Sequence, residues 1–393
     1  MIVNQQLLAG LTQKSCSRPV IILRSRSHLL QPMALRPKVL VVGAGIVGAF
    51  VAWHLSRNGA RVIVLDATHA TGGIASARSF GWLNASAGNP EPYLHLRFRA
   101  MDEWRRFASD FPGLAVDWCG GLTWDVALGD MDQFVANHTA WGYQVHRIDS
   151  RKIRELEPNL RNPPESAVHA PAEGAAEAGE VARTLLLRAA DLGVEIRTAT
   201  RALSLRVAER RVVGVRTSGG DVLADETVIA AGLGASQLAA SADLSLPMRS
   251  SPGMLVISRP LPRIIRNVVM TPEVYARQSR AGRVIASVDI DSEDDATASQ
   301  LAEAVATDLR KGFRGADLLQ VDSYSVTRRP NTIDGFPAIG RIEGVEGVYL
   351  AVMHSGVTLA PLVGRFAADE ILNGRRDTLL RTFGPKRFAR ACE

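Results

Sequence analysis

The sequence has few cysteines and no long apolar run. Its three cysteines, Cys16, Cys119 and Cys392, lie far apart and cannot form a CxxC metal or redox motif. No apolar run approaches the roughly 20 residues of a membrane-spanning helix, and no metal-ligand cluster or catalytic triad stands out. These absences predict a reduced, cytoplasmic setting, with no transmembrane segment and no metal site.

Acidic residues are absent from the first 32 residues of the chain. This stretch carries Lys14, Arg18, Arg24 and Arg26. Without these four charges the formal net charge falls from +6 to +2, so the basic character of the chain is no argument for nucleic-acid binding. No cluster of Lys and Arg interleaved with aromatic residues appears elsewhere.

Residues 1–37 are expected to form an N-terminal extension outside the fold. Their Ser- and Arg-rich, acid-free composition fits a mitochondrial-type presequence. Alternatively, Met33 is the true start, which places the first strand almost immediately after it. We favour the second interpretation.

A strand, a glycine turn and a helix follow one another from residue 38. The buried strand "KVLVV" runs into "GAGIVG", with Gly43, Gly45 and Gly48 at the G-x-G-x-x-G spacing. Gly43 makes the tight turn, Gly45 lets a pyrophosphate approach the backbone, and Gly48 lets the helix pack closely on the strand. The N–H groups at the start of the helix, at Ile46 and Val47, would face the phosphates. The pattern predicts a dinucleotide site.

The second strand and the loop after it favour FAD over a nicotinamide cofactor. "RVIVLD" ends at Asp66, 23 residues after Gly43, where a carboxylate can accept hydrogen bonds from the adenosine ribose. From Ala67 the chain continues as "ATHATGGIASARSFGWLNASAGN", a long loop rich in Gly, Ser and Ala. A plain nicotinamide Rossmann domain would turn to its next helix here.

These blocks, with "RRPNTIDGFPAIGR" and "MHSGVT" further along, resemble the FAD-dependent D-amino-acid oxidase superfamily, which includes glycine oxidase, sarcosine oxidase and D-amino-acid dehydrogenases. The resemblance runs from Lys38 to about Leu372. It implies an α/β fold in which a Rossmann-like FAD-binding domain is interleaved with an antiparallel-sheet α+β substrate domain. The expected FAD-binding segments are 38–98, 165–237 and 330–393, and the expected substrate-domain segments are 99–164 and 238–329.

The resemblance also implies cofactor-binding residues in separate blocks. They are Ala75, Ser76 and Ser79 in the loop beside the isoalloxazine, Ala202 at the adenine, Ala231 and Gly232 where the chain passes under the cofactor, Arg329, and Gly356, Val357 and Thr358 at a helix start that faces the flavin pyrimidine. The flavin is expected to be non-covalent, because Thr327 stands where monomeric sarcosine oxidases have the cysteine that carries it. Sarcosine oxidases also have an oxygen-activating lysine near Thr358.

Three residues are candidates for work on the substrate. Arg329 matches the family's Arg-Pro arginine, whose bidentate fork holds the substrate carboxylate. Pairing with Asp334 or another acid is the alternative, and Arg328 should point to the opposite face. Tyr275, which shares a strand face with Arg277, would line the pocket or lie exposed. His354 would transfer protons or serve only as a structural hydrogen bonder.

The predicted reaction is oxidation of the CH–NH bond of a small amine or amino acid carrying a carboxylate, by hydride transfer to flavin N5, to give an imine. Three alternatives stay open: a relative that passes electrons to a quinone or partner subunit, a nicotinamide-dependent dehydrogenase, and a flavin-carrying subunit without turnover of its own. An electron-acceptor partner or a second copy of the chain are the macromolecular partners left open.

Overall fold

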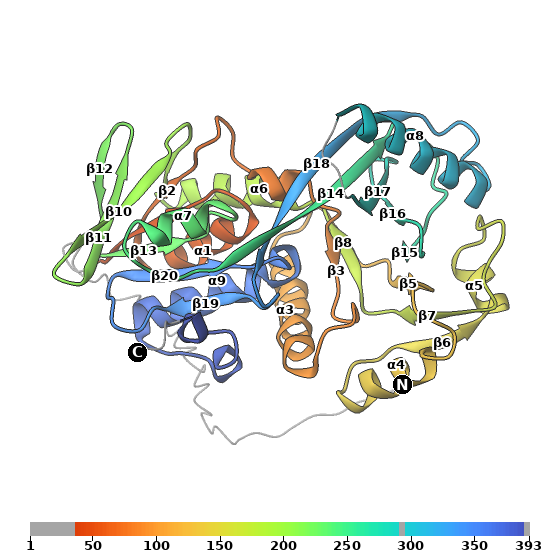
Figure 1. The fold of residues 1–393 in the computed structure, drawn as a ribbon, viewed down its shortest axis with the longest axis horizontal. Helices are drawn as coiled ribbons and strands as arrows, with labels where there is room; N and C mark the ends of the chain where they lie inside the picture. The colour runs from red at the N-terminus through yellow and green to blue at the C-terminus, as the bar shows by residue number, and fades with distance from the viewer. Residues whose placement is uncertain (1–35, 291–294, 389–393) are drawn as a thin grey trace, which may run out of the picture. The chain divides into compact units, whose positions relative to one another are not determined.

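The computed structural model describes residues 36–290 and 295–388. The predicted N-terminal extension lies outside the described residues up to residue 35. Two sheets organise the described part of the chain from Pro37 onward (Figure 1).

The first sheet has six strands in the order β19-β20-β13-β1-β2-β9. Its strands are β1 (Lys38–Val42), β2 (Arg61–Leu65), β9 (Glu195–Arg197), β13 (Glu226–Ile229), β19 (Ala338–Arg341) and β20 (Val348–Val352). All neighbours pair in parallel except β19 with β20. The short apolar runs recognised in the sequence are typical of such a sheet, which is covered on both faces.

Side chains alternate between the two faces of this sheet, and different elements pack against each face. Val39 and Val41 pack against the helices α1 (Ile46–Arg57), α6 (Ala178–Asp191) and α9 (Gly356–Asn373). Leu40 and Val42 pack on the other side, with the meander of β10 (Ala202–Ala208), β11 (Arg211–Thr217) and β12 (Gly220–Leu223) and with α7 (Gly234–Ala240). The glycine turn after β1 is therefore held between two hydrophobic layers.

The second sheet has eight strands in the order β18-β14-β17-β16-β15-β5-β7-β6. They are β5 (Gly121–Thr123), β6 (His146–Asp149), β7 (Ser166–Ala170), β14 (Met248–Ser258), β15 (Val268–Met270), β16 (Tyr275–Gln278), β17 (Val284–Asp289) and β18 (Val321–Thr332). Only β15 and β5 pair in parallel. Helix α8 (Asp295–Gly312) packs on this sheet, and β14 and β18 extend as a long ribbon toward β20 (Figure 1).

Smaller elements connect the two sheets. They are α2 (Ile74–Ala77), α3 (Glu91–Asp110), α4 (Met131–Ala140), α5 (Ser150–Leu156) and the three-stranded sheet of β3 (Trp82–Leu83), β8 (Gly174–Ala176) and β4 (Val116–Asp117). The predicted boundary at residue 98 falls inside α3, and β7, in the segment expected for the FAD-binding domain, pairs within the eight-stranded sheet. The mixed α/β architecture itself is as predicted.

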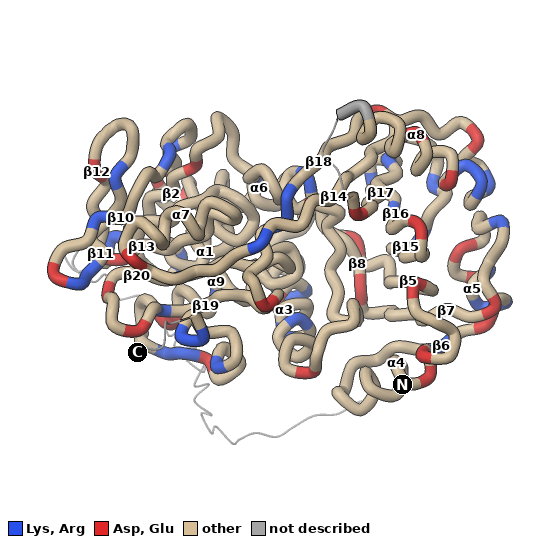
Figure 2. The backbone as a smooth tube through the Cα atoms, in the orientation of Figure 1, with Lys and Arg blue, Asp and Glu red and all other residues tan. Residues whose placement is uncertain are grey.

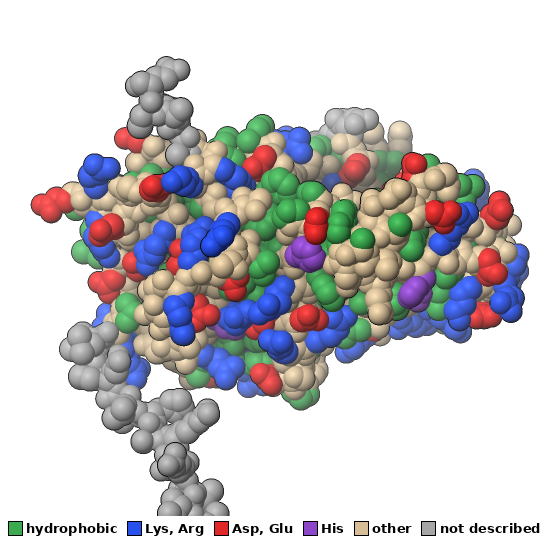
Figure 3. All heavy atoms as spheres, turned by 90° about the horizontal axis from the view of Figure 1, so that it is seen from below, with side chains coloured by type: hydrophobic (Ala, Val, Ile, Leu, Met, Phe, Trp, Pro, Cys, Tyr) green, Lys and Arg blue, Asp and Glu red, His purple; other side chains and the backbone are tan. Residues whose placement is uncertain are grey.

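Charged side chains of both signs are interspersed. Figure 2 shows Asp and Glu beside Lys and Arg along much of the chain, and Figure 3 shows the same mixture around a green apolar band on the face seen from below. Positive charge is therefore not gathered into one patch on the face shown.

Candidate active site

One large cavity contains nearly all of the residues that the sequence singles out. Its volume is about 1070 Å³, and its walls come from the ends of β1, β2 and β20, from the loop after β2, and from β14, β16 and β18 of the other sheet. Pockets for small ligands usually measure about 300–1,000 Å³. The cavity is thus large enough for an extended cofactor together with a small substrate.

The glycine turn forms the first wall. Gly43 has φ of +113°, and a Cβ atom there would collide with the carbonyl of Ala230 on the way out of β13. A Cβ at Gly73 would lie 2.6 Å from Cα of Gly45, so the loop after β2 passes close to the glycine cradle, the turn of Gly43 and Gly45 at the start of α1. Gly48 is the exception among the predicted residues. It does not line the cavity, because it packs against the carbonyl of Gly43 and brings the helix close to the strand.

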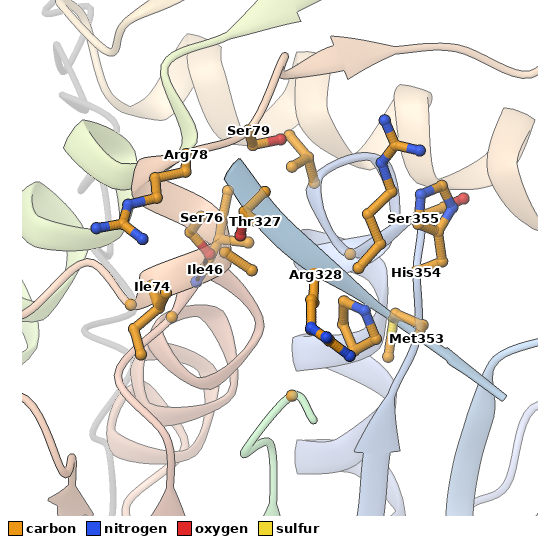
Figure 4. A pocket seen from close by; sticks show the side chains of 18 of the residues that line it. Ile46, Ile74, Ser76, Arg78, Ser79, Thr327, Arg328, Met353, His354 and Ser355 are labelled. Carbon is orange, nitrogen blue, oxygen red and sulfur yellow. Dashed lines mark hydrogen bonds between the residues drawn. The ribbon is translucent and has the colours of Figure 1, made fainter. Parts of the chain in front are cut away.

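Ser76, a residue of α2, lies beside the start of α1. Its hydroxyl accepts a hydrogen bond of 3.0 Å from the N–H of Ile46, and Figure 4 shows the two side by side. Ala75 and Ser79, its predicted companions, also line the cavity. The loop after β2 therefore closes over the helix start, and an anion at this cradle would meet both a helix N-terminus and a serine hydroxyl.

Asp66 lines the cavity, and its carboxylate already accepts hydrogen bonds from the glycine turn and from Thr68. Its Oδ2 accepts from the N–H of Ala44 at 2.7 Å, and its Oδ1 accepts from the N–H and hydroxyl of Thr68 at 2.8 and 2.6 Å. A carboxylate has about four lone-pair sites. Asp66 thus holds the glycine turn in place and retains one acceptor position for a ligand. Ala67 and Ala202 line the same end, and Ala231 and Gly232 follow nearby.

Another wall of the cavity is formed by the start of α9 and the loop before α3. Gly356, Val357 and Thr358 line it, and a Cβ atom at Gly356 would lie 3.1 Å from Cγ2 of Val47 at the start of α1. The N–H of Gly356 already donates to the carbonyl of His354 at 2.8 Å. Thr358 is buried, and its hydroxyl donates to the carbonyl of Trp82 at 3.2 Å. This end of α9 therefore directs the positive pole of an 18-residue helix toward the cavity.

Arg329 reaches into the cavity from β18 and is paired. Its NH1 lies 2.5 Å from Oδ1 of Asp289, whose side chain is 84% exposed. The acid named as its alternative partner, Asp334, pairs with Arg387 instead. Arg328 also lines the cavity, and its Nη1 donates to the hydroxyl of Ser250 at 3.0 Å.

Tyr275 lines the cavity, but Arg277 does not. The Tyr275 hydroxyl donates to Oδ2 of Asp125 at 2.7 Å, and burial together with that carboxylate raises the pKa of the phenol well above its usual range. Arg277 is buried behind Phe80, where NH1 lies 2.6 Å from Oε1 of Glu177. The shared strand face therefore predicted one pocket residue correctly and missed that the second is covered by the loop after β2.

His354 stands between two arginines. Its side chain is exposed toward the cavity, near Met353 and Ser355 in Figure 4. The pKa of His354 is lowered to about 4, first because the cavity walls keep bulk water away and then because Arg329 and Arg97 are positively charged. The imidazole is neutral at pH 7 and can accept a hydrogen bond.

Arg97 is a cavity residue that the sequence reasoning missed. It lies on α3, is 6% exposed and lines the same end as Ser355. A signal existed: Arg97 falls among Tyr93, Met101 and Trp104 on the buried face of the helix, where an arginine is unusual.

Membrane-spanning helices and metal clusters are both absent from residues 36–290 and 295–388. No helix in these ranges has the length and apolarity required to cross a membrane. Nor do three or more His, Cys, Asp or Glu side chains gather there as metal ligands would.

Comparisons with known proteins agree with the geometry of the site. Residues 38–370 match the family described as "DAO: FAD dependent oxidoreductase". Glycine oxidase of Geobacillus kaustophilus is 28% identical over 358 residues, which is 86% of this chain and 93% of that protein. One of the subunits of opine oxidase from Rhizobium meliloti is 25% identical over 366 residues, which is 88% of this chain and 96% of that protein.

Solved structures show the same fold at lower sequence identity. The L-proline dehydrogenase of P. horikoshii superposes with a TM-score of 0.80 at 21% identity, covering 90% of this chain and 98% of that one. The glycine oxidase of Geobacillus kaustophilus gives 0.79 at 22% identity, covering 91% and 100%. The glycine cradle, the start of α1 and the length of the cavity fit a flavin dinucleotide. The chain therefore belongs to the DAO family of FAD dependent oxidoreductases, and FAD is its cofactor.

Proposed function

We propose that this protein oxidises the CH–NH bond of a small amino acid or amine that carries a carboxylate, giving an imine that water then hydrolyses. The names of its relatives support the substrate class, since glycine and opines are amino acids or their derivatives. The single observation that carries the proposal is the continuity of one cavity from the glycine cradle at Gly43 and Gly45 to the guanidinium of Arg329.

The roles of the cavity ends follow from the residues present. Gly43, Gly45, Ile46 and Ser76 would hold the pyrophosphate, and Asp66 the adenosine, so that the flavin ring occupies the end formed by the start of α9. A flavin bound there would accept two electrons and one proton from the substrate, as a hydride. The protein contributes position and electrostatics.

Arg329 is the proposed anchor for the substrate carboxylate. A guanidinium binds a carboxylate through two parallel hydrogen bonds and so fixes the direction of the carbon beside it. In this structure Nη1 of Arg329 donates to Oδ1 of Asp289. Because the Asp289 side chain is 84% exposed, it can swing into water when a substrate carboxylate takes its place. Binding is then an exchange of one carboxylate for another.

Tyr275 and His354 complete the substrate end. Tyr275 stays protonated at neutral pH and has its proton committed to Asp125, so we assign it a packing and orienting role beside Trp82, at 6.3 Å between ring centroids. His354 is neutral and faces the cavity, so it can accept an N–H from the substrate amine. Oxidation of a neutral amine needs no stronger base.

The test is an anaerobic titration of the purified yellow holoprotein, followed by its visible spectrum. The titrants are D- and L-amino acids, glycine, N-carboxyalkyl amino acids and N-methyl amines, each beside an analogue without a carboxylate. Bleaching of the flavin band by carboxylate-bearing amines supports the proposal. A flavin that dithionite reduces but no amine bleaches contradicts it.

A second candidate is a flavin-carrying subunit that passes electrons to a partner or quinone rather than to oxygen. The opine oxidase relative favours it, since its name describes one subunit of a larger enzyme, as does Thr358 at the place of the sarcosine-oxidase lysine. Slow oxygen consumption beside fast dye reduction by the same substrate would identify it. The nicotinamide alternative is not retained, because the family uses FAD. The two-domain division and the cytoplasmic location remain predictions.

A further inference from the structure

Arg97 is a buried cation whose hydrogen bonds all go to neutral groups. Nε of Arg97 donates to the backbone carbonyl of Asn84 at 3.0 Å, and Nη2 donates to the side-chain Oδ1 of Asn84 at 2.5 Å. NH1 donates to Oδ1 of Asn89 at 3.2 Å and to the hydroxyl of Ser355 at 3.0 Å. Among the described residues, no carboxylate forms an ion pair with it.

A buried charge without an ion-pair partner is unfavourable, and the contact with the Tyr93 ring, whose centroid lies 5.4 Å from Cζ of Arg97, compensates it only in part. Burial lowers the pKa of Arg97, and Glu173 acts on it without a hydrogen bond. The Glu173 carboxylate is itself occupied by the hydroxyl of Tyr143, the indole of Trp82 and two backbone N–H groups. Removing an arginine's charge partner while keeping it buried is strongly destabilising in general. The position therefore suggests an anion supplied from outside the chain.

The cavity is where that anion would lie. Arg97 lines it together with Asn84, Asn89 and Ser355, the groups to which it is bonded. Ser355 immediately precedes α9, so the guanidinium and the positive pole of that helix act on the same end of the cavity. The hydrogen bonds of Arg97 go to Asn84, Asn89 and Ser355, and none goes to the glycine turn or to Ser76, so we do not assign it to the pyrophosphate.

We propose that Arg97 is the fixed positive charge that stabilises the reduced flavin ring. Uptake of two electrons and one proton leaves the ring with one negative charge, whatever the donor of the electrons. Neutral hydrogen-bond partners suit this role, because a carboxylate partner would cancel the field at the ring. The proposal rests on FAD as cofactor and not on the choice of amine substrate.

The experiment measures the two-electron midpoint potential of the holoprotein by anaerobic reduction with dithionite in the presence of a reference dye. The variants are Arg97→Gln, Arg97→Lys and, as the matched control, Arg99→Gln, an exposed arginine two residues along the same helix. We expect Arg97→Gln to lower the ratio of reduced to oxidised flavin at a given dye ratio at least about tenfold, which is about 30 mV for a two-electron couple. The midpoint potential of Arg97→Lys should stay close to that of the wild-type protein, and the midpoint potential of Arg99→Gln should equal it.

A second readout separates charge from scaffolding. In the wild-type protein the potential should fall by about 30 mV per pH unit, as expected for one proton per two electrons, and in Arg97→Gln by up to about 59 mV at the acidic end, where the reduced ring gains a second proton. If Arg97→Gln does not retain FAD, Arg97→Met takes its place as the neutral variant with which wild type and Arg97→Lys are compared. Unchanged potential and slope in Arg97→Gln, or a Lys variant with the potential of a neutral one, would overturn the proposal. None of these outcomes depends on whether an amine bleaches the flavin.

Discussion

Arg329 and Asp289 form an ion pair across an intervening strand, above a glycine. In the strand order β18-β14-β17, Gly253 of β14 is paired with Asp289 on one side and with Thr327 on the other. A Cβ atom at Gly253 would collide with NH2 of Arg329 and lie 2.7 Å from its Cζ. The arginine therefore crosses β14 through the space that the glycine leaves, and the same space sets its position at the substrate end.

Asp289→Asn should strengthen the binding of carboxylate substrates. The aspartate competes for Arg329, and an exposed ion pair of this kind contributes up to about 1 kcal/mol. We expect the Kd of a carboxylate ligand, measured by anaerobic flavin titration, to fall by about twofold to fivefold. Asp322→Asn, which breaks the Arg283 pair elsewhere on the sheet, is the control and should have no effect. Weaker binding in Asp289→Asn would mean that Asp289 itself holds the substrate.

Arg329→Ala should lose activity only toward substrates with a carboxylate. A charge-assisted hydrogen bond contributes about 1.5–3 kcal/mol, so kcat/KM should fall by roughly 10- to 100-fold for the acid. The same enzyme assayed with the matching amine that lacks the carboxylate provides the internal control. An equal loss for both substrates would assign Arg329 to flavin binding or to folding.

Gly253→Ala should impair substrate binding without unfolding the protein. The new methyl group meets the mobile end of the Arg329 side chain, which can move aside. Gly364→Ala is the contrasting variant, because its Cβ would lie 2.7 Å from the backbone of Phe50 at the contact between α1 and α9. Overpacking of this kind costs about 1–3 kcal/mol. Thermal unfolding should show a lower Tm for Gly364→Ala alone, and ligand titration a weaker affinity for Gly253→Ala. The reverse pattern would show that Arg329 is held rigidly and Phe50 is not.

Stability should fall between pH 6.5 and about pH 4 partly through His54. Burial first, then Arg365 and Arg57, lowers the pKa of His54 to about 4, and its Nε2 is buried without a partner in the described part of the chain. In this range the unfolded histidine binds a proton and the folded one does not, so the free energy of unfolding decreases as the pH falls.

The His54 contribution amounts to at most about 3 kcal/mol over that range. Urea unfolding of His54→Gln across the same pH range should give a shallower decrease, whatever its absolute stability. His146→Gln, at an exposed histidine on β6, serves as the control and should keep the wild-type slope. Parallel curves for His54→Gln and wild type would exclude the assignment.

The part of the site around the glycine turn and Asp66 was predictable because its determinants are local. A short apolar strand, three spaced glycines and a helix specify their own geometry, since tight turns and close packing depend on neighbouring residues. Asp66 was predictable for the same reason, at the end of the next strand. The structure adds that its carboxylate holds the turn itself, through Ala44 and Thr68.

The substrate end could not be derived from spacing. Period-two alternation placed Tyr275 and Arg277 on one face, but only the packed structure shows that Phe80 covers Arg277. The sequence favoured a substrate carboxylate as the partner of Arg329, with Asp334 or another acid as the alternative. The acid that pairs with Arg329 comes from a strand two places away in the sheet. Pairing across a sheet depends on register, which sequence spacing does not contain.

The sequence by itself thus determined the cofactor class, the glycine cradle and the family to which the chain belongs. Tertiary structure decided which charges face the cavity. Arg97, Asp289, Arg329 and His354 come from α3, β17, β18 and the loop before α9, and they act on one another only because the folding of two sheets brings them to one cavity. Electrostatic interactions depend on distance and on exclusion of water, and the folded chain alone sets both.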